Sequence, residues 1–244
     1  LTMSHFRTSL AIRQLFDYET WTYTYLLWDE VTKEAALIDT VREQYERDLN
    51  LVKELGLTLK YTLDTHIHAD HITANGLLRD TTGAEIIIHK NAAISCADQL
   101  VTDGQKFYLG EHAIEVMHTP GHTNMDISYR IEGAVFTGDT LLVRDCGRTD
   151  FQLGDTQAMY NSLQRLFALP EDTIVFPGHD YKGFSCSTIG EEKRFNVRAG
   201  NGKTFAEFKE IMDAMKLPPP RRLAISVPGN MVCGRVDEPA EATA

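Results

Sequence analysis

Three histidines and one aspartate fall within six consecutive positions of this chain, directly after a segment that alternates like a strand. Residues 66–71 read His-Ile-His-Ala-Asp-His. His66 and His68 are two positions apart, so their imidazoles face the same side of an extended segment. Asp70 and His71 fall where we expect a helix to begin, and they point into the same space from that turn. Because imidazole and carboxylate are common metal ligands, the cluster predicts a metal site.

Three more candidate ligands each follow a predicted strand and a tight turn. They are His122 and His179, each after Pro-Gly, and Asp139, after Gly138. Ligand-binding groups gather at strand ends in open α/β sheets, where side chains converge. Each residue would be a weak signal alone, since an aspartate after glycine is commonly a turn former. The other four histidines are interpreted as ordinary hydrogen-bonded residues: His5, His89, His112 and His118.

The remaining sequence alternates strand-like and helix-like segments. Residues 22–27 and 35–38 predict strands. Residues 40–43 have capping-box spacing and predict a helix that ends at Gly56. Helical spacing also marks 72–78 and a last helix at 205–215, which the prolines at 218–220 end. This alternation predicts one α/β domain with mixed sheets, over residues 1–236, and a flexible tail at 237–244.

Composition and charge exclude several classes of function. The 244 residues are 43% hydrophobic, which is typical of a globular chain rather than a disordered one. No run approaches the eighteen apolar residues of a membrane span. The formal net charge of −11 repels phosphate backbones and anionic lipids, so we expect neither a nucleic-acid partner nor a membrane.

The four cysteines are widely separated and form no C-x-x-C pair. Cys96, Cys146, Cys186 and Cys233 are therefore predicted to be reduced thiols, and Cys146 a buried, inert one. The first residues lack the charged-then-apolar pattern of a signal peptide. We expect a cytoplasmic protein, with an organellar location left open.

The histidine motif, followed at increasing distance by His, Asp and His, resembles the metallo-β-lactamase fold. The resemblance extends over residues 9–235 and implies an αββα sandwich of two mixed sheets with outer helices. Within that superfamily the chain is most similar to the persulfide dioxygenases, also called sulfur dioxygenases. The segments that carry this similarity are 14–17, 65–73, 138–142, 146–152, 177–181, 190–196, 227–231 and 233–234.

The resemblance implies one ferrous ion per chain, held by His66, His122 and Asp139. A face of two histidines and one carboxylate leaves open positions for substrate and O₂, as in non-haem oxygenases. The other four groups match ligands of dinuclear relatives and are interpreted as supporting residues or a vestigial second metal site: His68, Asp70, His71 and His179. Because all seven groups are present, the sequence leaves a second metal open.

The implied reaction joins glutathione persulfide, O₂ and water to give sulfite and glutathione. Glutathione carries carboxylates, so Arg148 and Tyr181, at positions that resemble glutathione contacts in related thioesterases, are the candidate substrate-binding residues. The alternative for Arg148 is an internal salt bridge with Asp145 or Asp150, and Tyr181 could equally be a packed aromatic. A homodimer and a separate sulfurtransferase partner are further expectations, since these 244 residues contain no rhodanese domain.

Two segments depart from the family pattern. After His122 the chain continues Thr123-Asn124-Met125-Asp126, and after Asn196 it continues Val197-Arg198-Ala199. The first departure is expected to reshape the wall beside His122, and the second to alter access of substrate. Neither touches a proposed iron ligand, so they bear on the identity of the thiol carrier more than on the chemistry.

The main alternative function is a dinuclear zinc hydroxyacylglutathione hydrolase of the glyoxalase II type, which uses the same seven groups. Segments 147–152 and 227–234 favour the dioxygenase. A β-lactamase is disfavoured by the lack of secretory features, and a nuclease by the lack of a basic track. A non-catalytic member of the fold would be expected to have lost ligands, and none of the seven is missing.

Overall fold

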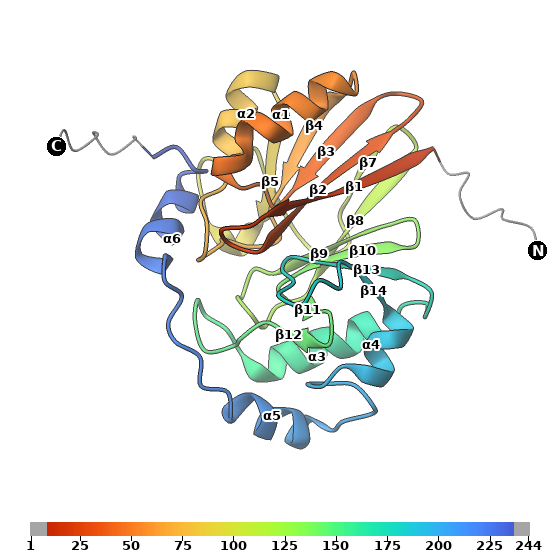
Figure 1. The fold of residues 1–244 in the computed structure, drawn as a ribbon, viewed down its shortest axis with the longest axis vertical. Helices are drawn as coiled ribbons and strands as arrows, with labels where there is room; N and C mark the ends of the chain where they lie inside the picture. The colour runs from red at the N-terminus through yellow and green to blue at the C-terminus, as the bar shows by residue number, and fades with distance from the viewer. Residues whose placement is uncertain (1–8, 237–244) are drawn as a thin grey trace, which may run out of the picture.

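The computed structural model describes residues 9–236, and they form two six-stranded sheets packed face to face with helices on the two outer sides (Figure 1). This arrangement confirms the predicted αββα sandwich. The first sheet contains β1 Leu10–Asp17, β2 Thr22–Asp29, β3 Glu34–Ile38, β4 Thr58–Leu63, β5 Glu85–His89 and β6 Gln99–Val101, in that spatial order. The second contains, in spatial order, β14 Ser187–Thr188, β13 Ile174–Pro177, β10 Ala134–Gly138, β9 Ile127–Ile131, β8 His112–His118 and β7 Lys106–Leu109.

Both sheets are mixed, as the alternation predicted. Strands β1 to β3 pair antiparallel, and β3 to β6 pair parallel. In the second sheet β10 pairs parallel with β13, and the other neighbours are antiparallel. Parallel neighbours end at the same sheet edge. The carboxyl ends of β3 and β4, and those of β10 and β13, therefore bring the segments that follow them together.

Helices cover the outer faces. Helices α1 Tyr45–Glu54 and α2 Asn75–Thr82 lie on the first sheet, α3 Thr156–Phe167 lies on the second, and α4 Ile189–Phe195 and α5 Phe205–Asp213 pack against α3. The remaining elements are α6 Leu223–Met231, the short 3₁₀ helices Arg42–Gln44 and Lys90–Ala92, and the hairpin β11 Leu141–Leu142 with β12 Asp145–Cys146. None of the helices within residues 9–236 is long and apolar enough to cross a membrane.

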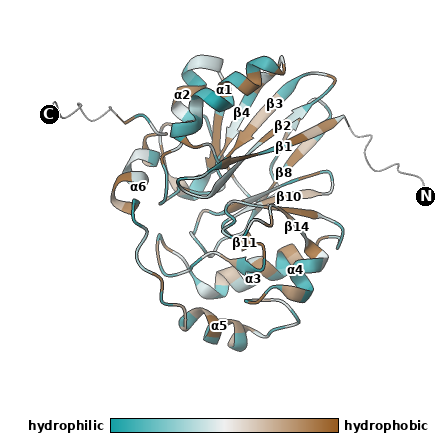
Figure 2. Cartoon of the chain, viewed as in Figure 1, coloured by the Kyte–Doolittle hydropathy of each residue, from teal (hydrophilic) through white to brown (hydrophobic). Residues whose placement is uncertain are grey.

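The central strands alternate between two apolar layers, which is why every residue of β2 and β10 is buried. In β2, Tyr25 and Leu27 face the second sheet, whereas Leu26 and Trp28 pack under α1 and α2. In β10, Phe136 faces the first sheet and Val135 packs against α3 and α5. Figure 2 shows hydrophobic residues along the strands between the layers and hydrophilic ones on much of α1 and α2. Because successive side chains of a strand point to opposite faces, a strand between two apolar layers is buried on both faces.

Three predictions about helix boundaries are wrong. The capping box at residues 40–43 does not form, because the Thr40 hydroxyl contacts Thr73 and donates to Asn75 Oδ1 instead of capping a helix. The helix predicted at 72–78 begins only at Asn75, so Asp70 and His71 lie in a loop. A further helix, α6, follows the prolines at 218–220, where we expected none. The predicted domain boundary at 236 stays a prediction, and the tail predicted at 237–244 lies outside the described residues.

The prediction of four reduced thiols is wrong for two of the cysteines. Cys96 and Cys233 form a disulfide, with their Cα atoms 6.1 Å apart. The two cysteines are 137 positions apart, so their spacing did not indicate a pair; only the return of the chain after α6 brings Cys233 to the loop before β6. Cys146 and Cys186 are free, the first buried and the second exposed.

Candidate metal centre

The donor atoms of His66, His122 and Asp139 converge at the edge of the two sheets. These residues follow β4, β8 and β10, and their donor atoms all lie within 4.8 Å of one another. Asp139 Oδ2 lies 3.7 Å from His66 Nε2 and 3.5 Å from His122 Nε2. Nitrogen and oxygen ligands about 2.0–2.2 Å from a metal ion are separated by such distances. The three residues can therefore hold one divalent metal ion.

Hydrogen bonds on the far side of each imidazole direct its Nε2 atom toward this shared space. The Nδ1–H group of His122 donates to the backbone oxygen of Arg148 at 2.9 Å. The Thr65 hydroxyl donates to Asp39 Oδ2 at 2.9 Å, so it accepts from His66 Nδ1, which also lies 2.9 Å away. Such outer partners set the tautomer and orientation of metal-binding histidines. The single lone pair on Nε2 of each ring is thus available to a metal.

The turn around Asp139 depends on close backbone approach at two glycines. A Cβ atom on Gly178 would lie 2.9 Å from Asp139 Oδ1. A Cβ atom on Gly147 would clash with the backbone oxygen of Asp139 and lie 3.0 Å from His122 Nδ1. A side chain at either position would push Asp139 or His122 out of place.

His179 bridges the carboxylates of two other site residues. Its Nδ1 lies 2.7 Å from Asp139 Oδ1, and its Nε2 lies 2.8 Å from Asp70 Oδ2. Burial opposes protonation of this ring, but the carboxylates of Asp139 and Asp70 outweigh it and hold the pKa of His179 well above its ordinary value. Burial would raise the pKa of Asp139, but His179, followed by His66 and His122, holds it below its ordinary value. Asp139 is therefore an ionised ligand.

The imidazole of His66 is kept neutral. Burial is the largest cause, and together with the His68 ring it lowers the pKa of His66 well below its ordinary value. A metal binds the neutral imidazole, so the lowered pKa favours metal binding over protonation.

Two further buried histidines have a ring nitrogen with no hydrogen-bond partner within the described residues. His68 Nε2 lies 3.0 Å from Asp39 Oδ1 while its Nδ1 is unpartnered, and His71 Nδ1 lies 3.1 Å from Asp70 Oδ2 while its Nε2 is unpartnered. Donor atoms of His68, Asp70 and His71 also lie within 4.8 Å of one another. Unpartnered buried nitrogens are costly unless something binds them. The site thus retains spare donors beside the first three.

The two candidate substrate contacts differ in their surroundings. Tyr181 is 63% exposed, and its ring is stacked on that of His179 with centroids 6.0 Å apart. The Arg148 guanidinium instead forms a two-pronged salt bridge with Asp150, at 2.6 and 2.9 Å, and donates to the backbone oxygens of Leu217 and Pro218. The internal salt bridge that was the alternative for Arg148 is therefore present, and contact with a substrate carboxylate stays a prediction.

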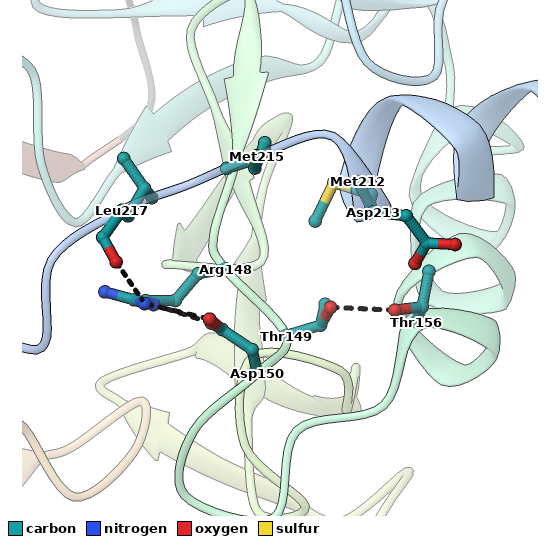
Figure 3. Close-up of a pocket in the computed structure, with 8 residues that line it drawn as sticks. All are labelled: Arg148, Thr149, Asp150, Thr156, Met212, Asp213, Met215 and Leu217. Atoms are coloured by element: carbon teal, nitrogen blue, oxygen red, sulfur yellow. Dashed lines mark hydrogen bonds and ion pairs between the residues drawn. The ribbon is translucent and has the colours of Figure 1, made fainter.

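A cavity of about 310 Å³ lies beside Arg148, between its loop, the start of α3 and the segment after α5 (Figure 3). None of the three proposed ligands lines it. Its lining residues are Arg148, Thr149, Asp150, Thr156, Met212, Asp213, Met215 and Leu217. The neighbouring Cys146 is buried as predicted, and burial raises the pKa of its thiol.

The first segment that departs from the family pattern forms a turn beside His122. Asp126 accepts from the backbone N–H and the hydroxyl of Thr123, at 2.7 and 2.9 Å. In the second segment, Asn196 Oδ1 accepts from the backbone of Arg198, and the Arg198 guanidinium donates to Asp145.

Four residues of the site were missed by sequence reasoning. Asp39 and Thr22 touch the histidines directly, Trp21 lies 6.2 Å from the ring of Tyr181, and Asn230 contacts the loop that carries residues 66–71. The position of Asp39 directly after a strand was the one usable signal. The others become visible only when distant segments are brought together.

Comparison with known proteins identifies the family. Residues 22–179 match the metallo-beta-lactamase superfamily. The mitochondrial persulfide dioxygenase ETHE1 of Bos taurus is 42% identical over 229 residues, which cover 92% of this chain and 89% of the relative. The crystal structure of ETHE1 from Myxococcus xanthus superposes with a TM-score of 0.89 at 51% identity, covering 92% of this chain and 99% of that one. The chain belongs to the persulfide dioxygenase family.

Hydroxyacylglutathione hydrolases share less with this persulfide dioxygenase family member. The enzyme of Rhizobium meliloti is 37% identical over 171 residues, which cover 68% of this chain and 65% of the relative. The similarity to persulfide dioxygenases is therefore both higher and longer, in agreement with the segments that favoured the dioxygenase.

Proposed function

We propose that this chain oxidises glutathione persulfide with O₂ and water, giving sulfite and glutathione, at one ferrous ion held by His66, His122 and Asp139. The observation that carries the proposal is the convergence of two imidazoles and one carboxylate in a member of the persulfide dioxygenase family. Three protein ligands on one face suit ferrous iron in oxygenases. An iron ion held by these three residues would supply open positions for the persulfide sulfur and O₂.

The residues around this face have distinct tasks. His179 holds Asp139 Oδ1, which leaves Oδ2 directed at His66 and His122. Asp70 balances the charge of His179 from the other side. Because the three proposed ligands are between 1% and 13% exposed as side chains, bulk water has little access to them. These contacts support a site that keeps its geometry when the substrate arrives.

We further propose that the carrier thiol lies against Tyr181 and Trp21. Both rings are exposed, Tyr181 stacks on His179, and Trp21 lies 6.2 Å from Tyr181. Trp21 has a φ of +59°, in the left-handed region that a tryptophan rarely adopts. Unfavourable backbone conformations are retained mainly at functional positions. An exposed aromatic wall beside the ligands gives the non-reacting part of the substrate a surface to contact.

The second candidate function is the dinuclear zinc hydroxyacylglutathione hydrolase. The unpartnered His68 Nδ1 and His71 Nε2 favour it, because a second metal would need such donors. Against it, Asp70 Oδ2 and both nitrogens of His179 are already engaged with one another and with Asp139.

Oxygen consumption by protein loaded anaerobically with Fe(II), with glutathione persulfide added, tests the proposal. We expect rapid uptake with sulfite formed in equal amount, and one iron per chain by elemental analysis. No uptake by fully loaded protein would overturn the dioxygenase. Two zinc ions per chain with hydrolysis of an S-acylglutathione would establish the alternative.

Two histidine variants test which residues hold the iron. His122→Ala should lose iron and turnover together, whereas His118→Ala, a matched change four residues earlier, should keep both. His118 bonds the backbone oxygen of Asn124 and belongs to none of the clustered donor sets. Retained turnover in His122→Ala would contradict the proposed ligand set.

The homodimer, the sulfurtransferase partner and the cytoplasmic location stay predictions. The Bos taurus relative is named as mitochondrial, so an organellar location is the alternative to test. Sedimentation of the loaded protein would report the oligomeric state.

A further inference from the structure

Asn230, on α6, holds the loop that carries the histidine motif. Its side-chain NH₂ group donates to the backbone oxygens of His68 and His71, at 2.9 and 2.8 Å. Its side-chain oxygen accepts from the backbone N–H of Thr73 at 2.8 Å. Asn230 is buried, so all three bonds lie away from water.

The loop needs these partners because it has little regular structure of its own. Residues 64–74 form neither helix nor strand. Its first two residues still bond to strands, since the Asp64 N–H donates to Ile87 and the Thr65 oxygen accepts from Ile127, but the bonds of Asn230 fall on the part of the loop after them. Buried peptide groups without partners are costly. The side-chain amide of Asn230 therefore satisfies three peptide groups of the loop, one before Asp70 and two after it.

Helix α6 is held to the rest of the molecule by packing of Val227 on a buried apolar cluster and by a bond from the Arg42 guanidinium to the backbone oxygen of Gly234. It follows the extended segment after α5 and lies at the edge of the molecule, apart from the helices that cover the sheets (Figure 1). Ile225, Met231 and Val232 are exposed. The end of the helix is fixed by a bond from Gly76 N–H to the backbone oxygen of Cys233, at 2.9 Å, and by the disulfide to Cys96.

We propose that the Cys96–Cys233 disulfide is a thiol-sensitive latch that keeps Asn230, a positioning residue, on the metal-ligand loop. Two molecules of a small thiol reduce the disulfide: one disulfide forms between them, and each cysteine sulfur takes one proton. Cys96 is only partly buried, so a thiol can reach the bond. Reduction removes the covalent attachment at the end of α6, leaves the hydrogen bonds to Cys233 and Gly234, and so weakens the hold of Asn230. The metal is then released more easily.

This inference rests on the proposed metal site but not on the reaction carried out there. Its test therefore uses metal binding: Co(II) as a spectroscopic probe of ligand geometry, and transfer of Fe(II) to a chelator. If the chain proves to be a hydrolase, the same measurements still decide the latch.

Asn230→Ala should weaken metal binding, by less than the about 10–100-fold that losing a direct outer partner of a ligand causes, because Asn230 acts through the backbone of the loop that carries His66. Asn230→Asp keeps the acceptor for Thr73 and should lie between this variant and the wild type. Reduction by dithiothreitol, or Cys96→Ser, should speed metal loss and shift the Co(II) spectrum in the same direction. Cys186→Ser, at the exposed free cysteine, should change neither.

The decisive comparison combines the two changes. In Asn230→Ala, reduction of the disulfide should add little to metal loss, because the contact it protects is already absent. Equal metal retention in oxidised, reduced and Cys96→Ser protein would overturn the latch. So would an undiminished effect of reduction in Asn230→Ala. If Asn230→Ala does not fold, the Co(II) spectra of oxidised and reduced wild type decide the matter alone.

Discussion

Replacing Thr65 by valine removes one hydroxyl and keeps the shape of the side chain. Thr65 is buried, with 1% of the residue exposed. Its hydroxyl bonds to Asp39 Oδ2 and to His66 Nδ1, each at 2.9 Å. In Thr65→Val, the buried Nδ1–H group of His66 loses its acceptor, and the Asp39 carboxylate loses one donor. An unsatisfied buried donor costs about 1–3 kcal/mol, and a bond to a charged group contributes about 1.5–3 kcal/mol.

We therefore expect Thr65→Val to lower the free energy of unfolding of the metal-free protein by about 3 kcal/mol. Metal affinity should fall by about 10–100-fold, because the His66 tautomer is no longer set. Urea denaturation of the metal-free protein and equilibrium Co(II) titration measure the two effects separately. Thr65→Ser retains the hydroxyl and is the matched control.

The reasoning would be refuted if the valine variant matched the serine variant in both measurements. A loss of stability with unchanged metal affinity would assign the hydroxyl to folding alone, and would remove Thr65 from the description of the metal centre.

Three other predictions follow from single observations. Burial, followed by the His118 ring stacked 4.1 Å away, lowers the pKa of His89 to about 4. The folded state thus favours neutral His89. About 1–2 kcal/mol of the free energy of unfolding, present above pH 6.5, should be lost as the pH falls toward 4. In His89→Gln, the free energy of unfolding should change less with pH between about 6.5 and about 4. Trp21→Ala should raise KM for glutathione persulfide about tenfold, because it loses one aromatic contact worth about 1–1.5 kcal/mol. The kcat and the metal content should stay unchanged. An unaltered KM would show that Trp21 does not contact the substrate. A maleimide should label exposed Cys186 quickly and buried Cys146 only on unfolding, with Cys186→Ser protecting the native chain.

Local spacing was sufficient to predict much of the site. The prediction that His66 and His68 face one side agrees with rings 4.3 Å apart. The strand-end positions of His122, Asp139 and His179 are also confirmed, and their side chains meet. Each of these inferences depends on a few neighbouring residues: a period of two along a strand, or a glycine that permits a tight turn.

Predictions that depended on where a helix begins were less successful. Thr40 has the spacing of a cap, yet its hydroxyl bonds to Asn75 and contacts Thr73, because the loop after β4 folds onto it. Asp70 and His71 lie before α2 rather than at its start, because Asn230 supplies the loop with bonds that a helix would otherwise provide. Tertiary contacts outweighed local propensity at both places.

By itself, the sequence determined the layered α/β class, the strand boundaries near the ligands and the chemical identity of the candidate donors. Those properties follow from hydrophobic period and turn chemistry, which act over a few residues. Only the tertiary structure decided that Asp39 and Thr65 orient His66, that Cys96 pairs with Cys233, and that Arg148 pairs with Asp150. Such contacts depend on how packed sheets and returning segments bring side chains together, and sequence spacing does not encode the distances between them.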